Sequence, residues 1–165
     1  MNHFEFFQLP EQFDVDTTLL KQRFLENSRK YHPDFHTLQD AAAQVKMLEL
    51  ATQNNLAYKT LQHSDSRLRY ILEINDMFNA TQNEALPPGF LMEMMELNEQ
   101  LDDAEGDATK IEAAQNEIQT ILDELENEAA DTLIGKPTPT LLAFAKSYFL
   151  KKQYLHRLNN RLENS

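Results

Sequence analysis

The 165-residue chain contains no cysteine, and this absence excludes disulfide bonds, thiolate metal sites and cysteine nucleophiles. It has only three glycines, Gly89, Gly106 and Gly135, and few runs of β-branched residues, whereas Leu, Ala, Glu, Gln and Lys are abundant. Residues that favour helices therefore dominate, and the composition predicts an all-α fold.

Long apolar stretches are also missing. None approaches the roughly 20 residues that a membrane-spanning helix needs, and no basic segment followed by an apolar one stands at the N-terminus. We therefore expect no membrane partner, no signal peptide and a cytoplasmic location.

Basic residues are scarce in the middle of the chain. The formal net charge is −12, and residues 76–135 contain one basic and 16 acidic residues, whereas residues 136–165 contain six basic residues and one acidic residue. An acidic surface repels phosphate backbones, so we expect no nucleic-acid partner. The asymmetry is equally compatible with an acidic helix that packs beside a basic one within a single bundle.

The first half of the chain predicts four helices. Asn2 and Glu5 form a possible capping pair for a short first helix. Asp14 or Asp16 can cap a second helix, which runs to about Tyr31 and ends because Pro33 cannot continue it. A third helix is expected over residues 40–62, and a short amphipathic one follows it.

The second half predicts a bundle of three helices. Residues 76–88 are rich in Asn and Pro and form the expected linker between a first domain, residues 1–75, and a second domain, residues 89–165. Helical periodicity covers about 89–104, 107–133 and 139–162, with Gly106 and Gly135 where C-terminal caps would fall. Short loops between long helices predict antiparallel neighbours.

The triplet His32-Pro33-Asp34 lies between two predicted helices. Proline restricts the backbone, so less freedom is lost when a partner binds. The Asp34 carboxylate suits a partner arginine, and His32 can both donate and accept hydrogen bonds. From these residues alone, a chance triplet in a plain loop, a metal site built on His32, Asp34 and His36, and acid–base catalysis all remain open.

The context of the triplet resembles the J-domain family throughout residues 1–72. Phe4, Phe7 and Leu9-Pro10 precede a helix, Tyr31-His32-Pro33-Asp34 follows it, and the next helix carries Asn55-x-Ala57-Tyr58-x-x-Leu61. The resemblance implies a helical hairpin with the triplet at its tip. It also implies that His32, Pro33 and Asp34 activate the ATPase of a DnaK-type chaperone, and that the preceding helix adds a basic face of Lys21, Arg29 and Lys30, which Arg23 could join. Phe35 departs from the family, because many J-domains have a basic residue there.

The predicted helix at 89–104 has two apolar arcs. At about 100° per residue, Phe90, Met94, Leu97 and Leu101 fall within about 60° of one another and form an ordinary core face. Leu91, Met92 and Met95 lie roughly 100–200° away from Phe90, beside acidic residues. An exposed apolar surface rimmed by charge is typical of a partner site, and methionine suits an adaptable one. The alternative is that this second arc contacts another part of the same chain.

This half of the chain, with its place after a J-domain, resembles the HscB family of J-domain co-chaperones of iron–sulfur cluster biogenesis. The matching stretch runs from Phe90-Leu91-Met92-Glu93 to Leu101-Asp102. The resemblance implies two partners, a chaperone of the HscA kind and an IscU-type scaffold, with no cofactor and no enzyme activity beyond activation of the partner's ATPase. The implied scaffold-binding residues are Leu91, Met92, Met95, Glu96, Glu99, Asp103 and Phe149.

Two points stay open at this level. On the last helix, Leu142 and Phe149 lie off the main apolar row and either extend the outer patch or widen the core contact. A J-domain protein with a different client, a metal-dependent enzyme and a purely structural adaptor are the competing functions. The zinc module that some eukaryotic relatives carry requires cysteine, so we expect no metal bound in that way.

Overall fold

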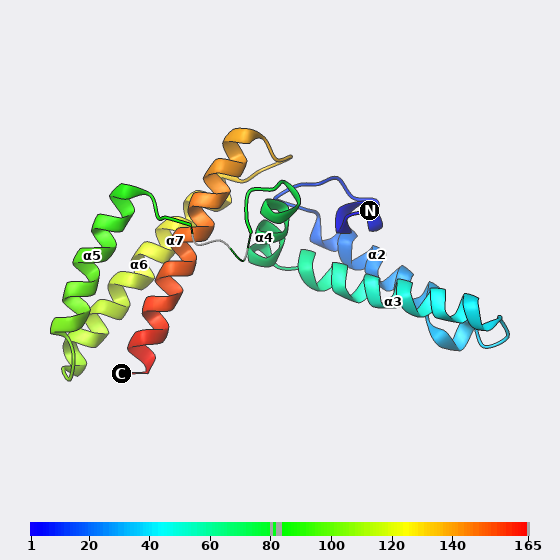
Figure 1. Cartoon of the computed structure of the whole chain (residues 1–165), viewed down its shortest axis with the longest axis horizontal. Coiled ribbons are helices and arrows are strands. Elements are labelled where there is room, and N and C mark those ends of the chain that lie inside the picture. Colours follow the sequence, from blue (N-terminus) through cyan, green and yellow to red (C-terminus); the bar gives the residue numbers. More distant parts are fainter. Residues whose placement is uncertain (80, 82–83, 165) are drawn as a thin grey trace. The chain divides into compact units, whose positions relative to one another are not determined.

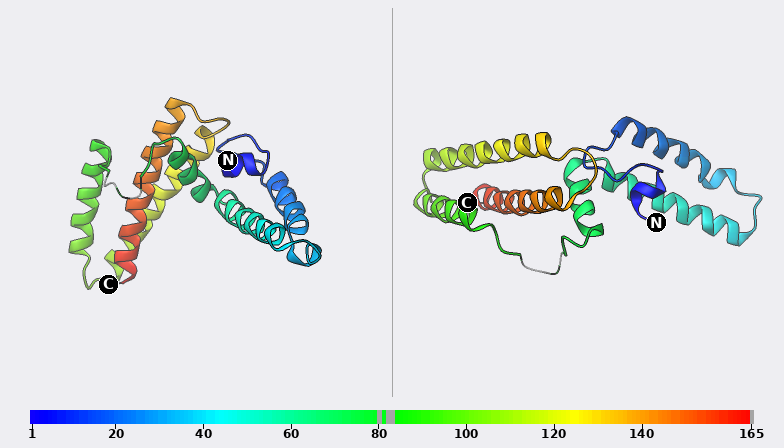
Figure 2. Two further views of the ribbon diagram at one scale, coloured as in Figure 1. Left: turned by 45° about the vertical axis from the view of Figure 1, so that its right-hand side comes forward. Right: turned by 90° about the horizontal axis from the view of Figure 1, so that it is seen from above.

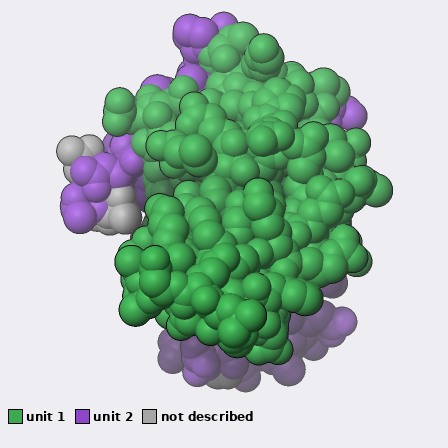
Figure 3. Space-filling view, turned by 90° about the vertical axis from the view of Figure 1, so that its right-hand side faces the viewer, with its two compact units in different colours: residues 1–76, 134–138 green, residues 77–133, 139–165 purple. Residues whose placement is uncertain are grey.

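The structure is a computed structural model that describes residues 1–79, 81 and 84–164, and this part of the chain is helical, with no strand. The chain divides into two compact units, which Figure 3 distinguishes by colour. The first unit comprises Met1–Asp76 together with Ile134–Thr138, and the second comprises Met77–Leu133 and Pro139–Ser165. The predicted all-α fold class is confirmed.

The first unit is built around a helical hairpin. Its elements are α1 (His3–Phe6), α2 (Thr17–Lys30), the 3₁₀ turn η1 (Pro33–Phe35), α3 (Ala41–Leu61) and α4 (Ser64–Ile74). Helices α2 and α3 run antiparallel, with η1 at the closed end of the hairpin (Figure 1 and Figure 2). Helix α3 is the central element, because α1, α2 and α4 all pack against it.

Local side-chain caps account for where these helices begin. The predicted capping box on α1 is present, since Asn2 accepts from the Glu5 N–H and Glu5 accepts from the Asn2 N–H, each at 2.9 Å. Of the two candidates for α2, Asp16 is the cap and accepts from the Leu19 N–H at 3.0 Å. Asp14 instead accepts from the Gly135 N–H at 2.7 Å, which holds the segment 134–138 within the first unit.

The core of the first unit is aromatic and aliphatic, and it encloses one buried cation. Phe4, Phe7 and Leu20 are buried, together with apolar residues of α3 and α4. Arg67 on α4 is only 7% exposed, and its guanidinium donates from Nε to the Phe13 carbonyl and from Nη1 to the Leu61 carbonyl, both at 2.8 Å. Burial lowers the pKa of Arg67, while the nearby Asp14 carboxylate acts in the opposite direction.

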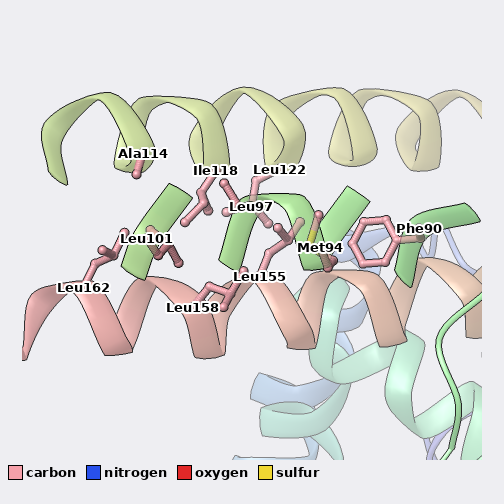
Figure 4. Packing of buried hydrophobic residues seen from close by; sticks show 10 residues of the cluster. All are labelled: Phe90, Met94, Leu97, Leu101, Ala114, Ile118, Leu122, Leu155, Leu158 and Leu162. Atoms are coloured by element: carbon pink, nitrogen blue, oxygen red, sulfur yellow. The ribbon is translucent and has the colours of Figure 1, made fainter. Parts of the chain in front are cut away.

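The second unit is a three-helix bundle of α5 (Pro88–Asp103), α6 (Ala108–Thr132) and α7 (Pro139–Glu163). Consecutive helices run antiparallel, as the short loops predicted (Figure 1). Figure 4 shows side chains of all three helices meeting in one core. The core face predicted for α5 is confirmed, because its four residues are buried there: Phe90, Met94, Leu97 and Leu101.

The glycines that follow α5 and α6 differ slightly from their predicted role. Gly106 and Gly135 have φ values of 78° and 82°, in the left-handed region that glycine tolerates best. However, the cap residues are Ala104 and Leu133, so each glycine lies two positions beyond the cap. The glycines therefore turn the loop after the helix rather than closing its last turn.

Replacing Arg67 with methionine tests the buried cation. Methionine can occupy the space of the side-chain stem but cannot donate to the two carbonyls, so the free energy of unfolding should fall by about 3 kcal/mol. Urea denaturation followed by circular dichroism measures the change. Arg69→Met is the matched control, because Arg69 is exposed and its pair with Glu73 should contribute less than about 1 kcal/mol. Equal losses in both variants would contradict the assigned role of Arg67.

His3 gives the first unit a pH dependence. Its ring stacks on Tyr70, with centroids 4.4 Å apart, and burial lowers the pKa of His3 below its ordinary value. The neutral ring is therefore favoured in the folded state. This contribution to stability is complete above the unfolded-state pKa of about 6.5 and is lost as pH falls through the lower folded-state pKa.

Thermal melts between pH 7.5 and 5 should accordingly show falling stability, and His3→Phe, which keeps a stacked ring, should reduce that fall. His63→Gln, at an exposed position, is the control. A His3→Phe melting profile that parallels the unmodified chain at every pH would show that His3 is not responsible.

Candidate functional site

The tip of the α2–α3 hairpin is a short turn held by its own hydrogen bonds. His32 has an extended backbone with ψ 131°, and its Nδ1 accepts from the Asp34 N–H at 3.2 Å. The N–H groups of Phe35 and His36 donate to the carbonyls of His32 and Pro33, at 3.1 and 3.0 Å. Pro33 begins the 3₁₀ turn at a position where its missing N–H is not needed. The triplet is therefore ordered before any partner arrives.

Two side chains fasten the turn to the helices on either side. His36 Nε2 lies 2.7 Å from the Lys30 carbonyl at the end of α2, and because a carbonyl only accepts, Nε2 carries the proton. Gln44 Nε2 on α3 donates to the carbonyls of Thr37 and Gln39, at 3.3 and 2.9 Å. The loop is thus anchored near both of its ends.

The functional groups of the triplet point to solvent. The side chains of His32 and Asp34 are 54% and 85% exposed, and His32 Nδ1 lies 3.7 Å from Asp34 Oδ2. Most of the Asp34 carboxylate is available to a cationic partner. The alternative metal site on His32, Asp34 and His36 gains no support, because the described residues contain no group of three such side chains able to hold a metal ion.

The three basic residues predicted to act with the triplet are all exposed on α2, but they do not share one face. At about 100° per residue, Lys21 and Arg29 lie about 80° apart, whereas Lys30 is rotated by about 180° from Lys21. The Lys30 ammonium instead lies over the ring of Tyr31, 5.5 Å from its centroid. Arg23 is engaged within the fold, since its Nη1 donates to the Phe7 carbonyl at 2.9 Å.

A second candidate surface lies on α5. The second apolar arc is exposed, by 43% at Leu91, 67% at Met92 and 62% at Met95. The predicted acidic residues are also exposed and continue the same side of the helix with steps of three and four. We call this surface the α5 stripe: Leu91, Met92, Met95, Glu96, Glu99 and Asp103.

A polar network that sequence reasoning missed joins α5 to α7. Asn98 Nδ2 donates to the Tyr154 hydroxyl at 2.7 Å, and Asn98 Oδ1 accepts from Arg161 Nη1 at 3.2 Å. Arg161 also pairs with Asp102, one residue before the end of α5. These bonds fix the rotation of α5 and so help to turn the α5 stripe outward. The only signal in the sequence was a polar residue between two core positions.

Phe149 has a neighbour that the sequence did not suggest. Its half-buried ring on α7 packs edge-on against Phe78, with centroids 4.9 Å apart and ring planes at 68°. Phe149 therefore neither belongs to the central core cluster nor stands fully exposed.

Comparisons with known proteins identify the family. The co-chaperone protein HscB homolog of Vibrio parahaemolyticus is 32% identical to this chain over 164 residues. The match covers 99% of this chain and 95% of the relative. The chain belongs to the HscB family. A family model described as the HSCB C-terminal oligomerisation domain matches residues 86–163. Members of the HscB family are named co-chaperones, and a further one, from Photobacterium profundum, is 40% identical over 115 residues, covering 69% of this chain and 67% of its own.

Solved structures of the HscB family share the fold. Chaperone HscB from Vibrio cholerae is 26% identical, with a TM-score of 0.67 over 99% of this chain and 96% of that one. Human co-chaperone HscB agrees in fold, with a TM-score of 0.73 at 24% identity. The match covers 99% of this chain and 81% of that one. A J-domain follows from membership of the HscB family. Within the described residues, no helix is both long and apolar enough to cross a membrane.

Proposed function

We propose that this co-chaperone stimulates the ATPase of a DnaK-type chaperone of the HscA kind and delivers an IscU-type iron–sulfur scaffold to it. The observation that carries the proposal is the ordered, solvent-facing triplet at the hairpin tip of an HscB-family chain. The exposed α5 stripe supplies a second surface, so that one molecule can hold two partners.

At the tip, the chain performs no bond chemistry of its own. Asp34 offers a carboxylate to a guanidinium of the chaperone, and charge-assisted hydrogen bonds of this kind are about twice as strong as neutral ones. Lys21 and Arg29 add positive charge along one side of α2, where an acidic chaperone surface can dock. Stimulation follows if this complex forms better with the hydrolysis-competent conformation than with the resting one, because a ligand shifts an equilibrium only by its differential affinity.

On the second unit, the α5 stripe binds the scaffold. Leu91, Met92 and Met95 provide apolar contact, and Glu96, Glu99 and Asp103 favour a scaffold surface with basic residues beside an apolar patch. Phe149 extends this surface if the scaffold either displaces the ring of Phe78 or contacts both rings. Holding both partners raises the effective concentration of scaffold near the chaperone. We place this activity in the cytoplasm, where the chaperone has ATP.

Replacing His32 with glutamine tests the tip. Glutamine keeps a donor and an acceptor but cannot reproduce the imidazole geometry that organises the turn, so stimulation of a HscA-type ATPase should be abolished while scaffold binding is retained. A steady-state ATPase titration measures this. His63→Gln, an exposed histidine on the same unit, should stimulate like the unmodified chain. Full stimulation by His32→Gln would refute the proposed mechanism.

The double variant Met92→Ala and Met95→Ala tests the α5 stripe. Both side chains are more than half exposed, so the bundle should keep its melting temperature while scaffold affinity falls about 10- to 100-fold, as for central interface residues. Isothermal titration with an IscU-type scaffold gives the dissociation constant. Ile134→Ala, another exposed apolar residue, is the control. Failure of the unmodified chain to bind any scaffold at micromolar concentration would instead favour a different client.

A further inference from the structure

An apolar groove lies directly beside the triplet, on the side of α3. Its volume is about 430 Å³. Pro33, Asp34 and His36 line it from the turn, while Val45 and Leu48 line it from the first turns of α3. These two aliphatic side chains are 56% and 58% exposed, although they lie on a helix whose opposite face supplies core residues. The fold therefore leaves more than half of each side chain uncovered.

The groove is formed before any partner binds. His36 is held to α2 by its 2.7 Å hydrogen bond to the Lys30 carbonyl, and Gln44 ties the loop back to α3 through two carbonyls. Both of these side chains line the groove. A site whose walls are already fixed loses little conformational entropy on binding, and apolar side chains that enter it gain most of their burial energy.

The turn and the loop after it expose large apolar side chains as well. Phe35 is 72% exposed in the turn, and Leu38, in the loop before α3, is fully exposed. Large exposed apolar side chains scattered singly need no explanation, but several gathered around one turn indicate a surface that is covered in a complex.

We propose that the groove receives an apolar side chain of the same DnaK-type chaperone whose cation binds Asp34. This inference rests on the proposed function of the triplet. The groove is continuous with the triplet, because Pro33 and Asp34 belong to both. This argues that one partner occupies both. A protein docked on the triplet therefore borders the groove, and its residue next to the Asp34-binding cation is within reach of Val45 and Leu48. The contact adds an apolar component to an otherwise charged interface.

The double variant Val45→Thr and Leu48→Gln tests the groove without adding charge. In a steady-state ATPase titration of a HscA-type chaperone with the full chain, we expect the half-maximal concentration to rise about tenfold through lost apolar burial. The maximal rate should stay near that of the unmodified chain. Leu56→Gln is the matched control, because Leu56 is 56% exposed on the same helix but does not line the groove. It should leave the half-maximal concentration unchanged.

Salt provides a second measurement. Exposed charge pairs weaken as ionic strength rises, whereas apolar contacts do not. If the groove is occupied in the complex, the half-maximal concentration of the double variant should exceed that of the Leu56→Gln control by the same factor, about tenfold, at 50 and at 300 mM KCl, concentrations spanning a roughly 2.5-fold change in screening length. A ratio that changes between the two salt concentrations would show that the double variant acts through the charged contacts, and this would count against the apolar contact. If the double variant melts below the unmodified chain, Val45→Thr alone carries both measurements.

His32→Gln in the same titration separates the two ideas. Stimulation that survives in His32→Gln overturns the proposed function itself. Stimulation that is abolished by His32→Gln but unchanged in the groove variant overturns only the inference about the groove. The other candidate occupant is a second copy of this chain, and sedimentation equilibrium of the chain alone tests it. If the unmodified chain self-associates and the double variant does not, while stimulation is unchanged, the groove binds a second copy.

Discussion

Pro33 has no backbone N–H and cannot extend α2, and the candidate chaperone site depends on how the chain satisfies that constraint. The helix ends at Lys30, whose carbonyl accepts a hydrogen bond from His36, and the chain turns back through three residues of 3₁₀ helix. His32 Nδ1 accepts a hydrogen bond from the Asp34 N–H, so the imidazole that we propose meets the chaperone also organises the turn. If the proposal holds, one side chain serves both the geometry of the turn and the contact with the chaperone, and the chaperone meets a turn that is already ordered.

Sequence reasoning predicted the helices well because their ends are set locally. Asn2, Asp16 and Asp107 cap their own helices within three residues, and Pro139 starts α7 where expected. Periodicity likewise identified the buried arc of α5. What escaped prediction depends on residues far apart in the chain. The hydrogen bond from Gly135 to Asp14 joins positions 121 residues apart, and no local pattern encodes it.

The candidate sites divide in the same way. The exposure of Leu91, Met92 and Met95 follows from helical geometry once the opposite arc is buried, and the sequence suffices for that. The basic residues of α2 were grouped because of the family resemblance, without regard to their angles about the helix axis. The angle of about 180° between Lys30 and Lys21 becomes clear only from the geometry of the helix. The contact of Phe149 with Phe78 and the groove beside Val45 both require the packing of two segments, which periodicity within one segment does not describe.

The composition of the α5 stripe has a chemical consequence. A chain without cysteine has no thiol to lose to oxidants, but Met92 and Met95 present their thioethers largely to solvent. Conversion of either sulfur to the sulfoxide would place a polar, chiral S=O group in the middle of the apolar part of the α5 stripe, and methionine sulfoxide reductases can reverse it. Peroxide would therefore make the α5 stripe more polar, while the buried Met94 and the rest of the bundle core stay unchanged.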